Sequence, residues 1–181
     1  MVERSTGATW AEIDSLHTRA MTSASEARAR LSPAGAVDLD RSLQELDRAR
    51  KAEDRTAFAL ASLEAKRNLI AAQDAATAKP PVSAELLLIA GQRYQALTRA
   101  KPTDWAALTA AAAAADEQWR QTAPLLSAQS IPNTMQASLT AMADAAKARD
   151  LFAAQQSAVL QIAAAREVVK ALDAAPPPAS R

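Results

Sequence analysis

The sequence contains no cysteine, only three glycines and one histidine, and aromatic residues make up just 3% of it. Without cysteine, disulfides, thiolate nucleophiles and cysteine-ligated metals are excluded. The isolated glycines Gly7, Gly35 and Gly91 form no phosphate-binding loop. A Ser-His-Asp triad could use only His17, and no nucleophile motif surrounds any serine. These absences predict that the chain is not an enzyme and carries no cofactor.

Charge of one sign is also lacking, because 21 basic and 20 acidic residues leave a net charge of +1. Acids and bases alternate within residues 41–55, which is typical of a solvated, self-neutralising helix face. Nucleic-acid binding needs a net basic patch, so we expect no nucleic-acid partner. The longest apolar run, Trp105 to Ala115, is too short to span a bilayer. Residues 1–9 show no apolar signal-peptide core. The sequence does not predict the cellular compartment, and a mature extracytoplasmic fragment is one of the alternatives.

Alanine supplies most of the 49% hydrophobic content of the 181 residues. Alanine is the best helix former, and strand-like runs of β-branched and aromatic residues are absent. The composition therefore predicts an all-α, antiparallel helical bundle of short helices, with more than about 70% helix against a base rate of about one third. Because alanine buries little area, the large side chains must supply much of the core.

Apolar spacing and capping residues place the helices along the chain. Thr9 and Glu12 form a capping box before a seam that contains Ile13, His17 and Ala24. Ser32-Pro33 ends that helix, Ser83 is a predicted cap, and Pro124 should shorten another helix. In the last segment the predicted seam runs through Met135, Leu139, Met142, Phe152, Val159, Ile162 and Val169. The predicted buried anchors are Trp10, Ile13, Leu43, Leu46, Leu63, Leu87, Leu97, Leu108, Trp119, Leu139 and Ile162.

An internal duplication is predicted, with pseudo-repeats over residues 9–77 and 104–174 joined by a helical segment, 83–101. Trp10 aligns with Trp105, and the element Lys-x-x-Asp occurs at 51–54, 101–104 and 147–150. If these elements are turns, the chain forms about seven helices of about 20 residues, and otherwise four long helices with a kink at Pro102. Both alternatives predict one helical domain over 9–174, followed by a disordered tail at 175–181.

His17 and Met21 are the candidate ligands for a metal or small molecule, because positions four apart share one helix face. If the last segment packs on the first helix, Met142, with Met135 on the same face, completes a His/Met cluster suited to Cu(I) or haem iron. The other interpretation is a hydrogen-bonded core histidine with methionine as core filler. We expect a pocket lined by His17, Met21 and Ala24, or else a bulky side chain that fills the space beside Ala24.

The hairpin 39–72, with its charged turn and Arg67-Asn68, resembles the last hairpin of the small soluble haem-b four-helix cytochromes of bacterial periplasms. The resemblance covers under a fifth of the chain and implies a hairpin within a bundle. Where that family carries its haem histidine, this sequence has Ala71. The resemblance therefore does not imply haem, and it does not assign the chain to the family.

Two functions from different classes follow from these observations. The first is a non-catalytic helical binding or scaffolding protein whose partner is another protein. The second is an extracytoplasmic small-ligand or metal-binding helical bundle that uses His17 and nearby methionines. The sequence leaves the oligomeric state open.

Overall fold

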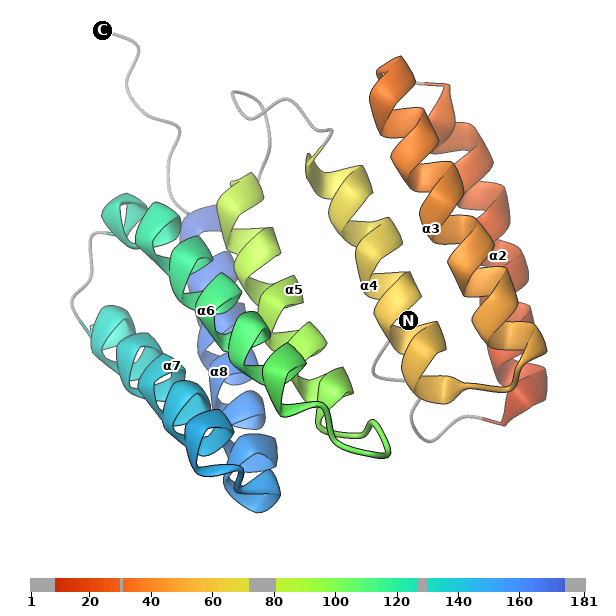
Figure 1. Ribbon diagram of the computed structural model, residues 1–181. Helices are drawn as coiled ribbons and strands as arrows, with labels where there is room; N and C mark the ends of the chain where they lie inside the picture. The colour runs from red at the N-terminus through yellow and green to blue at the C-terminus, as the bar shows by residue number, and fades with distance from the viewer. Residues whose placement is uncertain (1–8, 30, 72–80, 127–129, 175–181) are drawn as a thin grey trace, which may run out of the picture. The chain divides into compact units, whose positions relative to one another are not determined.

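The computed structural model describes residues 9–29, 31–71, 81–126 and 130–174, with the side chains of Leu16 and Ser130 left out. Within these ranges the chain forms seven α-helices and one short 3-10 helix, and 87% of it is helical with no strand (Figure 1). The predicted all-α helical bundle is confirmed, as is the alternative with seven short helices. The chain divides into two compact units, residues 1–73 and 74–181.

Unit 1 contains the helices α2 (Trp10–Arg28), α3 (Pro33–Lys51) and α4 (Arg55–Ala71). Unit 2 contains α5 (Val82–Leu97), α6 (Trp105–Thr122), the 3-10 helix η1 (Ala123–Leu125), α7 (Ser130–Ala148) and α8 (Leu151–Asp173). In the described part of the chain, no helix is both long enough and apolar enough to cross a membrane. The predicted tail at 175–181 lies outside the described residues.

Most of the predicted helix ends are confirmed. The hydroxyl of Thr9 accepts from the Glu12 amide and the Glu12 carboxylate accepts from the Thr9 amide, which completes the capping box. Ser32 caps α3 with Pro33 at its first position, and α6 ends two residues before Pro124. The cap predicted at Ser83 is wrong, because α5 begins at Val82 and Ser83 lies inside its first turn.

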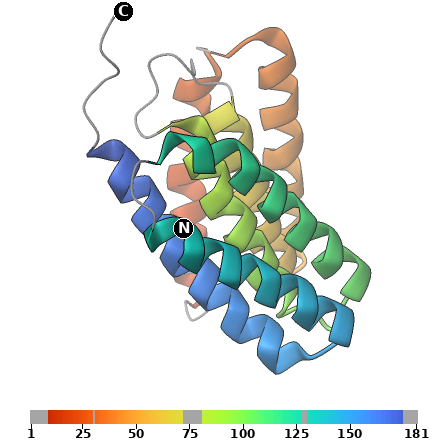
Figure 2. The same cartoon turned by 90° about the vertical axis from the view of Figure 1, so that its left-hand side faces the viewer.

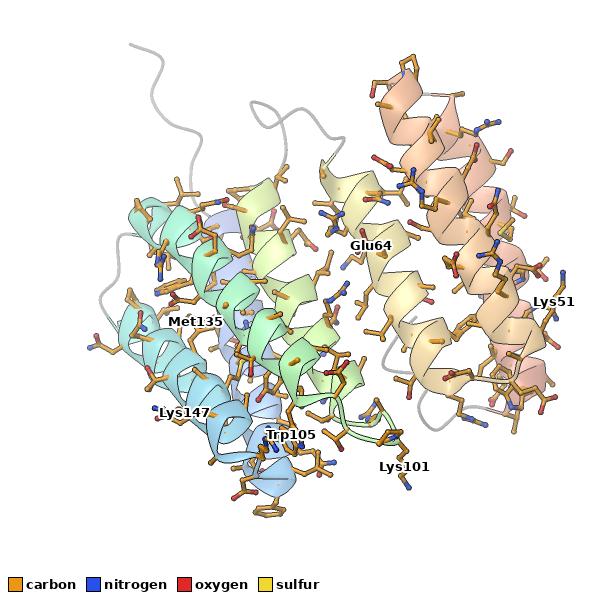
Figure 3. The ribbon with its side chains drawn as sticks, viewed as in Figure 1. Lys51, Glu64, Lys101, Trp105, Met135 and Lys147 are labelled. Carbon is orange, nitrogen blue, oxygen red and sulfur yellow. The ribbon has the colours of Figure 1, made fainter. Side chains whose placement is uncertain are left out.

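The two outer Lys-x-x-Asp elements are turns with the same backbone (Figure 3 labels their lysines). Glu53 and Arg149 have φ angles of 53° and 55°, and the amides of Asp54 and Asp150 donate to the carbonyls of Ala49 and Ala145. This is the Schellman ending of a helix, and the aspartate then caps the next helix. At the middle element Asp104 also caps a helix, but α5 has already ended at Leu97. The duplication and the single domain over 9–174 stay predictions.

Unit 1 is held together by two small apolar clusters and by ion pairs near both ends of α2. Ile13, Leu46 and Phe58 form the larger cluster with neighbouring alanines. Arg50 of α3 pairs with Asp14 at 3.1 Å, and Arg28 pairs with Asp40 of α3 at 2.7 Å, which fits an antiparallel helix pair. Such exposed pairs contribute about 0–1 kcal/mol each, so the apolar clusters provide most of the stability.

Unit 2 is a four-helix bundle in which each helix packs against two neighbours in the cyclic order α5, α6, α7, α8 (Figures 1 and 2). Its centre contains polar as well as apolar side chains. The hydroxyl of the fully buried Tyr94 donates to the carbonyl of Met142 at 2.9 Å. Gln161 of α8 has no exposed surface, and its amide nitrogen donates to the Leu87 carbonyl of α5 at 3.3 Å.

The predicted buried anchors are confirmed with two exceptions. Trp10 and Leu43 are only half-buried, because they pack at the edge of the apolar cluster in unit 1. The predicted seam of the last helix is wrong at Phe152 and Val159, which are 72% and 52% exposed. The face of α8 that enters the bundle instead contains four alanines together with Ser157, Gln161, Ile162, Val168 and Leu172.

Gly91 allows the close approach of α5 and α8. A Cβ atom at this position would lie 1.6 Å from the side-chain oxygen of Gln161, which is closer than any non-bonded contact allows. The oxygen therefore lies near the line of a Gly91 Cα–H bond, an arrangement typical of weak Cα–H···O contacts between helices. No other hydrogen-bond donor among the described residues reaches this oxygen.

Replacing Gly91 by alanine tests this contact. On helix propensity alone, Gly91→Ala would stabilise α5 by about 0.5–1 kcal/mol. Because the enclosed Gln161 amide must move, we expect the variant to lose about 1–3 kcal/mol of unfolding free energy in urea denaturation. Gly35→Ala is the matched control, since its nearest side-chain atom lies at an ordinary 3.4 Å. Gly91→Ala combined with Gln161→Ala should recover part of the loss, and a neutral Gly91→Ala would contradict the packing.

Candidate functional site

His17 lies half-buried on α2, with its side chain next to both other helices of unit 1. Its ring centroid is 6.5 Å from that of Phe58 on α4, at an interplanar angle of 49°. Its Nε2 atom is buried and has no hydrogen-bond partner among the described residues. A buried nitrogen without a partner has lost its hydration and gained no hydrogen bond in exchange. Nε2 of His17 therefore gains from a ligand that supplies a partner, as does Nε of Arg50, the other such atom among the described residues of unit 1.

The surroundings of His17 disfavour its charged form. Burial of the ring lowers the pKa of His17, and the Arg50 guanidinium on α3 lowers it further. The carboxylates of Asp47 and Asp14 oppose this shift but do not reverse it. A neutral imidazole is the form that can accept a hydrogen bond or ligate a metal through nitrogen.

The other predicted ligands lie in less favourable positions. Met21 is one turn from His17 on α2 and is 38% exposed. Met142 is fully buried in unit 2, where it packs in the bundle core with Met135. Among the described residues, no group of three or more His, Asp or Glu side chains could hold a metal ion. The structure thus gives His17 and Met21 on one helix as the accessible pair, and the metal site at His17, Met21 and Met142 stays a prediction.

The space beside Ala24 is occupied by leucine side chains. Ala24 is buried in a cluster with Leu39 and Ala65, against which Leu31, Leu43 and Leu69 pack. This is the alternative in which bulky residues from elsewhere fill the gap that alanine leaves. Of the expected pocket lining, Ala24 is therefore packed among leucines, and only His17 and Met21 retain exposed surface.

A second candidate site is the outward face of α8. It consists of the exposed residues opposite the buried face, namely Phe152, Gln156, Val159, Leu160, Ala163, Arg166 and Lys170. Among described residues, four of the seven exposed large hydrophobic side chains belong to α8: Leu151, Phe152, Val159 and Leu160. Phe152, Val159 and Leu160 are more than half exposed. One helix therefore presents apolar side chains both to its own bundle and away from it.

The outward face has the spacing of a coiled-coil seam. Its central residues, at positions 152, 156, 159, 163, 166 and 170, follow one another at intervals of four and three. This alternation is the a/d pattern that keeps a narrow stripe in contact with a second helix. The stripe is apolar or neutral in its first four positions and basic in its last two.

The sequence pattern placed Phe152 and Val159 of this face in the core and did not single out its other residues. The signal that could have separated the two faces is the second stripe of alanine, serine and glutamine half a turn away. Comparisons with models of protein families, with curated proteins and with solved structures gave no match.

The lowered pKa of His17 gives unit 1 a pH-dependent stability. The unfolded chain takes up a proton near the ordinary histidine pKa of about 6.5, above the pKa of the folded state. Acidification from pH 7.5 to 5.5 should therefore destabilise unit 1, because the unfolded state binds more protons in this range. His17 is the sole histidine, so His17→Gln should weaken this dependence. Hydrogen exchange of residues 10–71 at both pH values measures it, and an equal dependence in both proteins would exclude His17 as its source.

Proposed function

We propose that this chain is a non-catalytic helical binding or scaffolding protein whose outward face of α8 docks a helix of a protein partner. The observation that supports the proposal is the exposure of Phe152, Val159 and Leu160 on one face of one helix. Helices of the same bundle do not need these side chains, since α8 already buries its opposite face. Clustered exposed apolar side chains are typical of protein interaction sites.

The spacing of the face supports a helical partner in particular. A seam with alternating intervals of four and three accepts the side chains of a second helix between its own. Phe152 is a large aromatic anchor, and Ala163 leaves room for a close approach of the partner's backbone. Gln155 and Gln156 provide uncharged polar groups beside the apolar residues.

Capture from the native host tests the proposal with a matched pair of variants. The α8 variant of the tagged full chain carries Phe152→Gln and Val159→Gln. The matched control carries Val37→Gln, which alters a 57% exposed valine on α3. We expect the α8 variant to retain at most about one tenth of the captured partner, since loss of an interface anchor costs about 2 kcal/mol or more. The Val37 variant should capture as much as the wild type, and equal capture by all three proteins would reject the α8 face.

A second candidate function is the extracytoplasmic small-ligand or metal-binding bundle. The observation that favours it is the buried Nε2 of His17, which has no partner among the described residues, with Met21 one turn away. Imidazole and thioether are ligands that suit Cu(I).

Metal analysis and a visible spectrum of the purified protein test the second candidate. It expects stoichiometric metal or visible absorbance that His17→Gln and Met21→Leu each reduce, because each removes one ligand atom. Thr18→Val on the exposed surface of α2 is the control. A colourless protein that takes up no Cu(I) in titration would reject this function and leave the scaffold proposal standing.

A further inference from the structure

The order of residues along the outward face of α8 selects the partner helix. Phe152 lies at the N-terminal end of the face, Val159 and Ala163 occupy the middle, and Arg166 and Lys170 lie at the C-terminal end. A partner helix should therefore present small or apolar residues to the middle and a cation to the aromatic ring. A second copy of α8 that runs antiparallel meets both requirements, because its basic C-terminal end then lies beside Phe152 and its small and apolar residues lie at the middle.

We propose that the occupant of this face is the same face of α8 in a second copy of the chain, packed antiparallel about a twofold axis at the level of Gln161. The inference rests on the proposed function and names its partner. An interface of this kind is isologous, so each contact occurs twice.

A parallel arrangement of the two helices is disfavoured by charge. It would place Arg166 and Lys170 beside their own copies, two like-charged pairs in succession along the seam. Like charges in such positions are the means by which coiled coils reject a partner orientation.

The antiparallel arrangement removes both like-charge contacts. In an antiparallel seam of this type the a positions of one helix pair with the d positions of the other. Pairing about residue 161 sets Val159 against Ala163 of the second copy and Gln156 against Arg166 of that copy. Phe152 then meets Lys170, a contact of the cation–π type at both ends.

The flanks of the seam fit the same arrangement. Twofold symmetry brings each flank of α8 against its own counterpart, so Leu160 lies about 3 Å along the axis from its copy at 1.5 Å per residue. Glu167 occupies the same flank but lies about 18 Å along the axis from its copy. That separation exceeds the Debye length of about 8 Å at physiological salt, so repulsion between the two carboxylates is screened. All three strongly exposed apolar residues of α8 are then covered.

The size of the face predicts a transient dimer. The helix has 23 residues and is about 34 Å long. A single helix face of this length covers less than the roughly 800 Å² per partner that stable complexes bury. We therefore expect a dissociation constant in the micromolar range or weaker.

Sedimentation velocity of the full chain from about 10 to 500 μM, a range that brackets weak association, measures the dimer. We expect a concentration-dependent shift from monomer to dimer in the wild type. Phe152→Gln combined with Val159→Gln should raise the dissociation constant at least tenfold, while Val37→Gln leaves it unchanged. Circular dichroism confirms that each variant is folded. A monomer at every concentration, or a dimer that the α8 variant does not weaken, would overturn the inference.

Cross-linking with a short bis-maleimide tests the orientation, because the natural chain has no cysteine. Ala163→Cys lies near the proposed axis, about 6 Å along it from its copy, and should cross-link efficiently. Gln156→Cys, on the same seam but about 15 Å along the axis from its copy, should not, nor should the exposed Ala113→Cys on α6. Equal cross-linking through residues 163 and 156 would indicate parallel helices, because each seam position then meets its own copy, and would overturn the antiparallel arrangement.

The two proposals fail in different ways. A protein that stays monomeric but loses its captured partner through the α8 variant contradicts self-association and supports the docking face. If the α8 variant changes neither the capture of a partner nor the self-association of the chain, both proposals are contradicted.

Discussion

The close approach of α5 and α8 at Gly91 is the contact on which the arrangement of unit 2 depends. The amide of Gln161 occupies the place where any other residue at 91 would carry its Cβ atom, and it donates to the Leu87 carbonyl on the same helix. A buried amide held in this way fixes the rotation of α8 about its own axis, as single buried polar residues fix register in coiled coils. With Gln161 turned inward, residues half a turn away must face outward. The exposed positions of Phe152 and Val159 are therefore a consequence of a contact on the opposite side of the helix.

Alanine allows the helices to approach closely, but each alanine buries little apolar surface. The buried face of α8 is composed mainly of alanine and serine, so its helix axis can lie near those of α5 and α7. Larger side chains on the neighbouring helices, including Leu87, Tyr94 and Met135, fill the bundle. Small side chains contribute little apolar area each, at about 25 cal/mol per Å². A chain under this constraint gains nothing for its own stability by exposing phenylalanine, valine and leucine on α8, and the proposed docking face rests on this argument.

Local features of the sequence predicted the helices and their ends well, because a capping residue acts within three positions of itself. Thr9 is identified as a cap from the sequence alone, and Ser32, Asp104 and Asp150 cap their helices through the same local hydrogen bond. The rotation of α8 could not be predicted in this way. Hydrophobic periodicity finds the stripe of large residues, but α8 has two stripes. The buried one combines small residues and Gln161 with Ile162, Val168 and Leu172. What separates the two stripes is a contact with another helix, the approach of Gln161 to Gly91 of α5. The candidate site at His17 shows the same limit, since its place on the seam follows from spacing but the missing partner of Nε2 depends on α3 and α4.

Two of the buried polar atoms without a conventional partner, the Gln161 oxygen and His17 Nε2, differ in what surrounds them. The oxygen of Gln161 lies against a Gly91 Cα–H bond inside a helix pair that buries the whole side chain, so its environment is closed and serves the packing. Nε2 of His17 lies on a half-buried residue of α2, and among the described side chains of that helix only Ile13 and Ala24 are fully buried. Local detachment of α2 from the other helices of unit 1 therefore breaks few apolar contacts and lets water hydrate the imidazole again. The two atoms thus differ in their structural role. The Gln161 oxygen belongs to a closed contact that fixes which face of α8 is exposed. His17 Nε2 belongs to a helix with few buried residues, and it is stabilised in any state that supplies a hydrogen-bond partner.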